Sequence, residues 1–239
     1  DEIPLGPRVN EWSDKNGISE GFNFLYSGTL GMKHNPDLLL QLAQQMTGRA
    51  KVVVASQGKS VDYLREKGGD NLVLLPFQPS EDLAMMMASA DVLVAILEPD
   101  AGVFSVPSKV LTYHCAGRAL LLAVPLENLA ARIVFENKTG LVVPPTDNAS
   151  FLGQSEVLYN DGEMRQQMGE AARAYAEKTF DIEAIVELRH RRRTQLGRDG
   201  LGPFLRDDRA LVDLRQQRGL RLGEIFHGGD EAVHQGLDL

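Results

Sequence analysis

The sequence predicts an α/β fold built on a doubly wound, mostly parallel sheet of six strands. Short apolar runs alternate with helical segments of about 8 to 12 residues over most of the chain. Parallel neighbouring strands need such helical crossovers, whereas antiparallel strands are joined by short turns. The run 91–97 is almost continuously hydrophobic, as expected for a strand covered on both faces. These observations favour one Rossmann-like unit.

Caps and chain breakers set the boundaries of the expected elements. Asn35 is a candidate helix N-cap, and Pro36 suits the first helical position after it. Gly48 and Gly117 stand where two helices should end. The expected strands are 24–26, 51–55, 71–77, 91–97, 119–124 and 140–143. The expected helices are 36–46, 61–66, 80–90, 107–117, 128–137, 149–159, 163–177 and 182–193.

Composition excludes several classes of protein. A net charge of −8 argues against a dedicated nucleic-acid binder, which would carry a basic face. The single cysteine, Cys115, can form no intramolecular disulfide and no four-cysteine zinc site. Apolar runs such as 119–125 are far shorter than the roughly 20 residues that a membrane span needs. We therefore expect no membrane span, no signal peptide and a cytoplasmic location.

The composition changes near position 190. Residues 190–239 contain nine arginines, no lysine and eight glycines, and they show no long apolar periodicity. We expect residues 1–20 to be a linker, residues 21–189 to form the Rossmann-like domain, and residues 190–239 to form a poorly ordered Arg/Gly-rich tail. An amphipathic helix on an anionic membrane surface or partner is the alternative for the tail.

Two loops are candidate anion sites. Open α/β sheets bind ligands outside the carboxyl ends of their strands. The turn after the first strand has Gly28 and Gly31, whose amides can approach an anion, and Lys33 adds a positive charge. A tight turn with a solvated lysine is the alternative. The loop 98–109 ends at a second helix start, which carries Ser105, Ser108 and Lys109.

Other familiar sites are absent from the sequence. Gly58-Lys59-Ser60 resembles the end of a Walker A loop, but Val53 stands where that motif requires its first glycine. No G-x-G-x-x-G follows the first strand, which argues against a nicotinamide or flavin site. We find no metal-ligand spacing among the histidines and therefore predict no metal.

Three blocks of sequence together carry a resemblance. They are Phe24-Leu25-Tyr26-Ser27-Gly28-Thr29-Leu30-Gly31-Met32-Lys33-His34-Asn35, Val106-Pro107-Ser108-Lys109-Val110-Leu111-Thr112-Tyr113 running to Ala116-Gly117-Arg118, and Thr139-Gly140-Leu141-Val142-Val143-Pro144-Pro145. They resemble the donor-binding half of a family-4 glycosyltransferase, and most closely the bacterial enzymes that build exopolysaccharide, colanic-acid and O-antigen repeats. Such enzymes have the GT-B architecture, in which two Rossmann-like domains face one another and the second binds the nucleotide diphosphate sugar.

The resemblance implies roles for residues of the first turn and of the loop after the third strand. Gly28 matches the glycine loop and Lys33 the phosphate-binding lysine of the family. Thr29 stands where many members have a phosphate-binding arginine. Phe77 and Gln78 correspond to the turn that binds the base.

It also implies roles in the second loop. Pro107, Ser108 and Lys109 form the helix start beneath the diphosphate, with Ser105 in the loop before it. The family's two glutamates correspond to Phe104 and Thr112, so that signature is not intact. Thr112 can still hydrogen-bond a ribose hydroxyl. Glu98 would reach the donor sugar, and together with Lys33 it forms the expected catalytic pair.

The resemblance thus implies a retaining glycosyltransferase of the hexosyltransferase type, acting on a UDP- or GDP-sugar without a metal or another cofactor. The acceptor, a glycan or a lipid-linked sugar, would bind through an N-terminal domain, without which the chain looks incomplete. Peripheral association with the inner face of the membrane is compatible with this function. A GT-B sugar-nucleotide epimerase and a non-catalytic nucleotide-sugar-binding module remain the alternatives.

Overall fold

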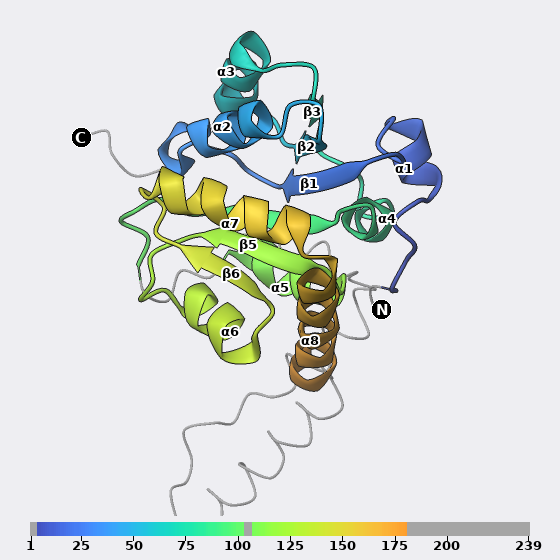
Figure 1. Ribbon diagram of the computed structural model, residues 1–239, viewed down its shortest axis with the longest axis vertical. Coiled ribbons are helices and arrows are strands. Elements are labelled where there is room, and N and C mark those ends of the chain that lie inside the picture. Colours follow the sequence, from blue (N-terminus) through green and yellow to red (C-terminus); the bar gives the residue numbers. More distant parts are fainter. Residues whose placement is uncertain (1–3, 103–106, 181–239) are drawn as a thin grey trace, which may run out of the picture. The chain divides into compact units, whose positions relative to one another are not determined.

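The fold is known from a computed structural model that describes residues 4–102 and 107–180 (Figure 1). All but the last two described residues belong to one compact unit, Ile3–Lys178. Ser105, the expected helix 182–193 and the expected tail lie outside the described residues.

Six parallel strands form a single sheet in the order β3-β2-β1-β4-β5-β6. The strands are β1 (Phe22–Ser27), β2 (Ala50–Ala55), β3 (Leu72–Leu75), β4 (Val92–Ile96), β5 (Ala119–Ala123) and β6 (Gly140–Val143). The predicted α/β class and doubly wound parallel sheet are therefore confirmed. Strand β3 is shorter than predicted, and it ends directly before Pro76, which has no N–H to donate to a neighbouring strand.

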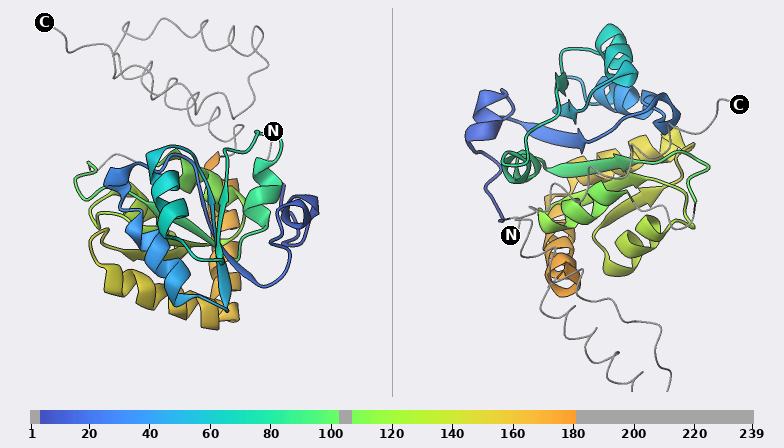
Figure 2. Two further views of the ribbon diagram at one scale, coloured as in Figure 1. Left: turned by 90° about the horizontal axis from the view of Figure 1, so that it is seen from above. Right: turned by 180° about the vertical axis from the view of Figure 1, so that it is seen from behind.

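Helices cover both faces of the sheet (Figures 1 and 2). They are α1 (Glu11–Lys15), α2 (Asp37–Gln45), α3 (Lys59–Lys67), α4 (Leu83–Ala88), α5 (Ser108–Cys115), α6 (Leu129–Asn137), α7 (Asn148–Asn160) and α8 (Gly162–Phe180), with the 3₁₀ helix η1 (Met32–His34) after β1. Side chains from α2, α3 and α7 pack on one face, and side chains from α1, α4, α5, α6 and α8 pack on the other.

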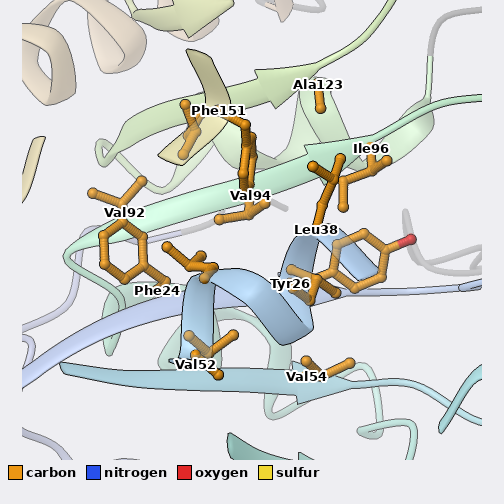
Figure 3. Packing of buried hydrophobic residues seen from close by; sticks show 14 of the residues in the cluster. Phe24, Tyr26, Leu38, Val52, Val54, Val92, Val94, Ile96, Ala123 and Phe151 are labelled. Carbon is orange, nitrogen blue, oxygen red and sulfur yellow. The ribbon is translucent and has the colours of Figure 1, made fainter. Parts of the chain in front are cut away.

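The central strands are buried on both faces because their side chains point alternately to the two sides. Phe24 and Tyr26 of β1 join the cluster that includes Phe151 of α7, as Figure 3 shows. Leu25, between them, joins the other cluster together with Trp12. This two-sided burial explains why the strands read as continuous apolar runs in the sequence.

The segment before β1 contributes to the domain. Asn10 caps α1 by accepting a hydrogen bond from the Ser13 amide, and the Ser13 hydroxyl oxygen accepts one from the Asn10 amide. The Asn10 side chain also donates to the Met85 carbonyl oxygen of α4. Trp12 is only 2% exposed. The segment 1–20, expected as a linker, therefore holds a capped helix and a core tryptophan.

The predicted N-cap at Asn35 is wrong. Asn35 has a φ of 49°, in the left-handed region, and ends η1, so that Pro36 takes the N-cap position of α2. Asparagine tolerates this conformation better than most residues. Its side chain donates to the Pro145 carbonyl oxygen instead of capping α2. The short η1 turn, which the sequence pattern did not indicate, displaced the cap.

We expect Gly140→Ala to destabilise the domain strongly. A Cβ atom at Gly140 would lie 2.1 Å from the Leu120 carbonyl oxygen of β5, so the two paired strands would have to separate. Overpacking of this kind should lower the free energy of unfolding by about 3 kcal/mol or more in a urea titration.

The matched control is Gly153→Ala in α7, where the added Cβ meets open space. It should stabilise the domain by about 0.5–1 kcal/mol. Equal effects of the two changes would contradict the close approach of β5 and β6.

Candidate functional site

The order of the strands places the topological switch point of the sheet between β1 and β4. The chain leaves β1 toward β2 on one side and leaves β4 toward β5 on the other, so the connections diverge between these two neighbours. Ligands of doubly wound sheets bind at this switch point, outside the carboxyl ends of the strands. The loop after β1 carries Gly28 and Lys33, and the loop after β4 carries Glu98 and leads to Ser108. Both predicted loops therefore start at the same rim.

Lys33 and Glu98 are in direct contact across this rim. The Lys33 Nζ atom lies 2.8 Å from Oε2 and 3.0 Å from Oε1 of Glu98. Imidazole Nε2 of His34 lies 3.7 Å from the same Oε2 atom. Burial lowers the pKa of His34 below its usual value, although the charge of Glu98 opposes this effect. The two residues predicted as the catalytic pair are thus brought together.

Lys109 reaches beneath the glycine turn from the first turn of α5. Its Nζ atom donates a hydrogen bond of 2.7 Å to the Tyr26 hydroxyl and lies 3.9 Å from the centre of the Tyr26 ring. Gly28 has a φ of 101°, and a Cβ atom there would lie 3.3 Å from Lys109 Nζ. Glycine is therefore required at position 28 by its backbone conformation and by the lysine tip beside it. Burial lowers the pKa of Lys109 to about 7.

A second side chain of α5 binds the end of β1. The Tyr113 hydroxyl accepts a hydrogen bond of 2.9 Å from the Ser27 amide and lies 3.2 Å from the Ser27 hydroxyl. Burial raises the pKa of Tyr113 to about 12, so this phenol is neutral at ordinary pH. Tyr26, Ser27 and Tyr113 were not among the predicted site residues. All three lie within the sequence blocks that carry the family resemblance, and Lys109 and Tyr113 are four residues apart on one helix face.

The amides of the glycine turn are used differently from the expectation. The Gly28 N–H donates to the Ala55 carbonyl oxygen, and the Gly31 N–H donates to Nδ1 of His34. The amides predicted to approach an anion are therefore already hydrogen-bonded. Those of Thr29 and Leu30 have no acceptor within the described ranges 4–102 and 107–180. They remain the candidates of this turn for binding an anion, with Thr29 exposed and Leu30 only 2% exposed.

The start of α5 is the second candidate anion site. Pro107 occupies the N-cap position, and Ser108 is exposed at the first helical position. The first amides of a helix have no carbonyl partner within it, so they can bind an anion. Thr112 lies one turn further along, with its hydroxyl 3.4 Å from the Ser108 carbonyl oxygen.

The predicted base-binding turn lies at the same edge of the sheet, after β3. Phe77 is 41% exposed. The Gln78 side chain is engaged within the protein, because its Oε1 atom accepts from Trp12 Nε1 and its Nε2 atom donates to the Pro76 carbonyl oxygen. Phe77 is thus the side chain of this turn that a ligand can reach without breaking a hydrogen bond.

A cavity of about 620 Å³ lies at the opposite edge, at the amino ends of β4 and β5. Asp91, Arg118, Arg165 and Arg173 are among its lining residues, and none of the predicted site residues that the structure describes lines it. Arg118 donates to the carbonyl oxygens of Gly6 and Ala88. Its guanidinium group therefore holds the chain in place there.

Two negative findings hold within the described part of the chain. No group of three or more acidic, histidine or cysteine side chains is placed to hold a metal ion. None of the helices is long and apolar enough to cross a bilayer.

The six parallel strands and their flanking helices define a Rossmann-like domain, and the predicted anion-binding residues that the structure describes lie in loops at its switch point. The chain matches the family described as Glycosyl transferases group 1 over residues 9–175, and it belongs to that family. No curated protein matches the chain.

Solved structures share the fold at low sequence identity. Anabaena Alr3699/HepE in complex with UDP-glucose is 15% identical with a TM-score of 0.68, over 82% of this chain and 56% of that one. WaaG, a glycosyltransferase involved in lipopolysaccharide biosynthesis, is 21% identical with a TM-score of 0.58, over 73% of this chain and 48% of that one. The chain thus spans about half the length of these two proteins.

A third structure is itself a domain. The C-terminal domain of the group 1 glycosyltransferase LpcC from Francisella tularensis is 13% identical with a TM-score of 0.59. The match covers 76% of this chain and 99% of that domain.

We expect Tyr113→Phe to destabilise the domain even though it removes a single oxygen atom. The change leaves the Ser27 amide without the phenolic oxygen that accepts its hydrogen bond. An unsatisfied buried donor costs about 1–3 kcal/mol, which a urea titration would detect. Unchanged stability would show that water replaces the phenol and that this bond does not hold α5 to β1.

Proposed function

We propose that this chain is the donor-binding domain of a glycosyltransferase that moves a sugar from a nucleotide diphosphate sugar, most simply UDP-linked, to a glycan or lipid-linked acceptor. The observation that carries the proposal is the meeting of Lys33, Glu98 and the start of α5 at the switch point of a group 1 glycosyltransferase domain. The UDP-glucose complex of HepE supports a nucleotide-sugar donor.

The chemistry needs few side chains. Glycosyl transfer creates an oxocarbenium-like centre while negative charge grows on the departing diphosphate. Fixed donors aimed at that charge lower the barrier most effectively where water is excluded. Lys33, the Thr29 and Leu30 amides and the start of α5 would supply these donors, with no metal in the proposed reaction.

Glu98 would respond to the donor through its contact with Lys33. A diphosphate within reach of Lys33 Nζ competes with the Glu98 carboxylate for the ammonium hydrogens. Once Lys33 turns toward the phosphates, Glu98 is available to accept hydrogen bonds from the hydroxyls of the donor sugar. We propose retention of anomeric configuration, with the leaving phosphate taking the proton of the acceptor, so no protein residue serves as the general base.

The remaining parts of the proposal rest on the resemblance to family-4 enzymes. The acceptor would bind an N-terminal domain facing the rim described above, and the longer solved structures, of which this chain spans about half, leave room for such a domain. The sugar transfer would take place in the cytoplasm, at the inner face of a membrane that carries growing polysaccharide. Thr112, at the position of a family glutamate, would hydrogen-bond the ribose.

Lys33→Met tests the proposed phosphate contact. In the complete enzyme, loss of one preorganised cationic donor should lower the transfer rate by roughly 10²–10³-fold. The matched control is Lys15→Met, which removes an exposed lysine from α1 and should leave the rate unchanged. The measurement is acceptor-dependent release of UDP from UDP-glucose. An unchanged rate in Lys33→Met would remove Lys33 from the site. If the unaltered protein binds nucleotide but releases no UDP, the non-catalytic nucleotide-sugar-binding module is favoured instead.

Phe77→Ala tests the proposed base site. Stacking of a base on an aromatic ring contributes about 1–3 kcal/mol, so loss of the ring should weaken UDP binding by about tenfold. Phe135 of α6 is 81% exposed and provides the matched control, since Phe135→Ala should not change UDP affinity. Titration calorimetry with UDP compares the two variants. Equal affinities would place the base elsewhere.

A further inference from the structure

The position of Lys109 is not explained by packing alone. Its Nζ atom lies against the Tyr26 ring and beside Gly28, where burial costs a charged amine much of its hydration. No carboxylate forms an ion pair with Lys109 among residues 4–102 and 107–180, because Glu98 is bound to Lys33. The charged form of Lys109 therefore lacks a counter-ion in this structure.

The surrounding groups do not supply that counter-ion. Tyr26 from β1 accepts the hydrogen bond of Lys109, and Tyr113 lies one turn along α5. Burial raises the pKa of both phenols, so both are neutral. His34 faces Lys109 from η1, and its protonated form would repel the charged amine. The carboxylate of Glu98, from the loop after β4, is shared by Lys33 and His34.

Lys109 is also connected by hydrogen bonds to the loop that the donor would contact. Its amine donates to the Tyr26 hydroxyl, and that hydroxyl donates a hydrogen bond of 2.6 Å to the Thr29 carbonyl oxygen. Thr29 supplies one of the two amides that remain open in the glycine turn. A charge on Lys109 therefore strengthens a chain of hydrogen bonds that ends in the anion-binding turn.

We propose that Lys109 is a positioning residue for the donor, which takes up a proton from solvent when the diphosphate binds and then holds the Gly28–Gly31 turn through Tyr26. This inference rests on the proposed function of the same site. A diphosphate diester brings two negative charges to the rim, and opposite charge favours the protonated amine. Binding and protonation are linked, so donor affinity should be highest below pH 7 and should fall as the pH rises above the pKa of about 7 of the unliganded protein.

Proton uptake can be measured directly by titration calorimetry of the full chain with UDP-glucose, whose diphosphate does not titrate near neutral pH. The heats of binding in HEPES and in Tris differ by the number of protons taken up, multiplied by the difference between the ionisation enthalpies of the two buffers. With a pKa of about 7, about a quarter of the Lys109 amines carry a proton at pH 7.5. We expect uptake of about 0.5 proton per UDP-glucose at pH 7.5, falling below about 0.1 at pH 6.

Variants separate Lys109 from the other titrating groups. Lys109→Met should abolish the uptake and weaken binding about tenfold. Lys109→Arg keeps a permanent charge, so it should restore binding to within about threefold without any uptake. His34→Gln should keep the uptake. Uptake that grows from pH 7.5 to pH 6, or that is lost in His34→Gln, would assign the proton to His34 and overturn the inference.

The outcomes also separate this inference from the proposed function. Binding of UDP-glucose by the unaltered chain with no proton uptake at pH 7.5 overturns the role of Lys109 and leaves the donor site standing. The absence of binding to both UDP-glucose and GDP-glucose overturns the donor site and this inference together. Because the decisive measurement uses the unaltered protein, it does not depend on whether Lys109→Met folds.

Discussion

A lysine amine and two phenols join α5 to the end of β1, and the candidate site depends on that junction. The sheet alone holds β1 and β4 side by side, but it does not fix the conformation of the loops that follow them. Hydrogen bonds from Lys109 to Tyr26 and from Ser27 to Tyr113 fix the first of these loops at two neighbouring residues of β1. They hold the start of α5 against the glycine turn, so the two candidate anion sites lie at the same rim of the sheet.

The charges at the rim are balanced before any ligand arrives. Glu98 holds the exposed Lys33 side chain, which would otherwise sample many rotamers. This contact places the ammonium group of Lys33 near the glycine turn. In the proposed reaction, the Glu98 carboxylate would then compete with the phosphates for that ammonium group. If the proposed donor binds here, some of its affinity is lost to this competition in return for a lysine that is already in position, as in other preorganised sites.

Much of the fold could be predicted from the sequence because parallel strands covered on both faces leave a clear apolar pattern. The loops were harder, since hydrogen bonds between distant residues decide them. Asn35 has the residue type of a cap, yet η1 places it in the left-handed region. Lys33 and Glu98 could be expected at the same rim, because both follow the carboxyl ends of parallel strands. The contact of Lys109 with Tyr26 could not be predicted, because no periodicity shows which hydroxyl a lysine will reach.

The hydrogen bond between Trp12 and Gln78 gives the domain an internal optical reporter. Trp12 is the single tryptophan of the chain, so its emission can be excited selectively. Its indole N–H is bound to the turn after β3, on which Phe77 also lies. Any rearrangement of that turn changes the hydrogen bonding of the indole, and with it the wavelength and intensity of the light emitted, without a dye or an added label.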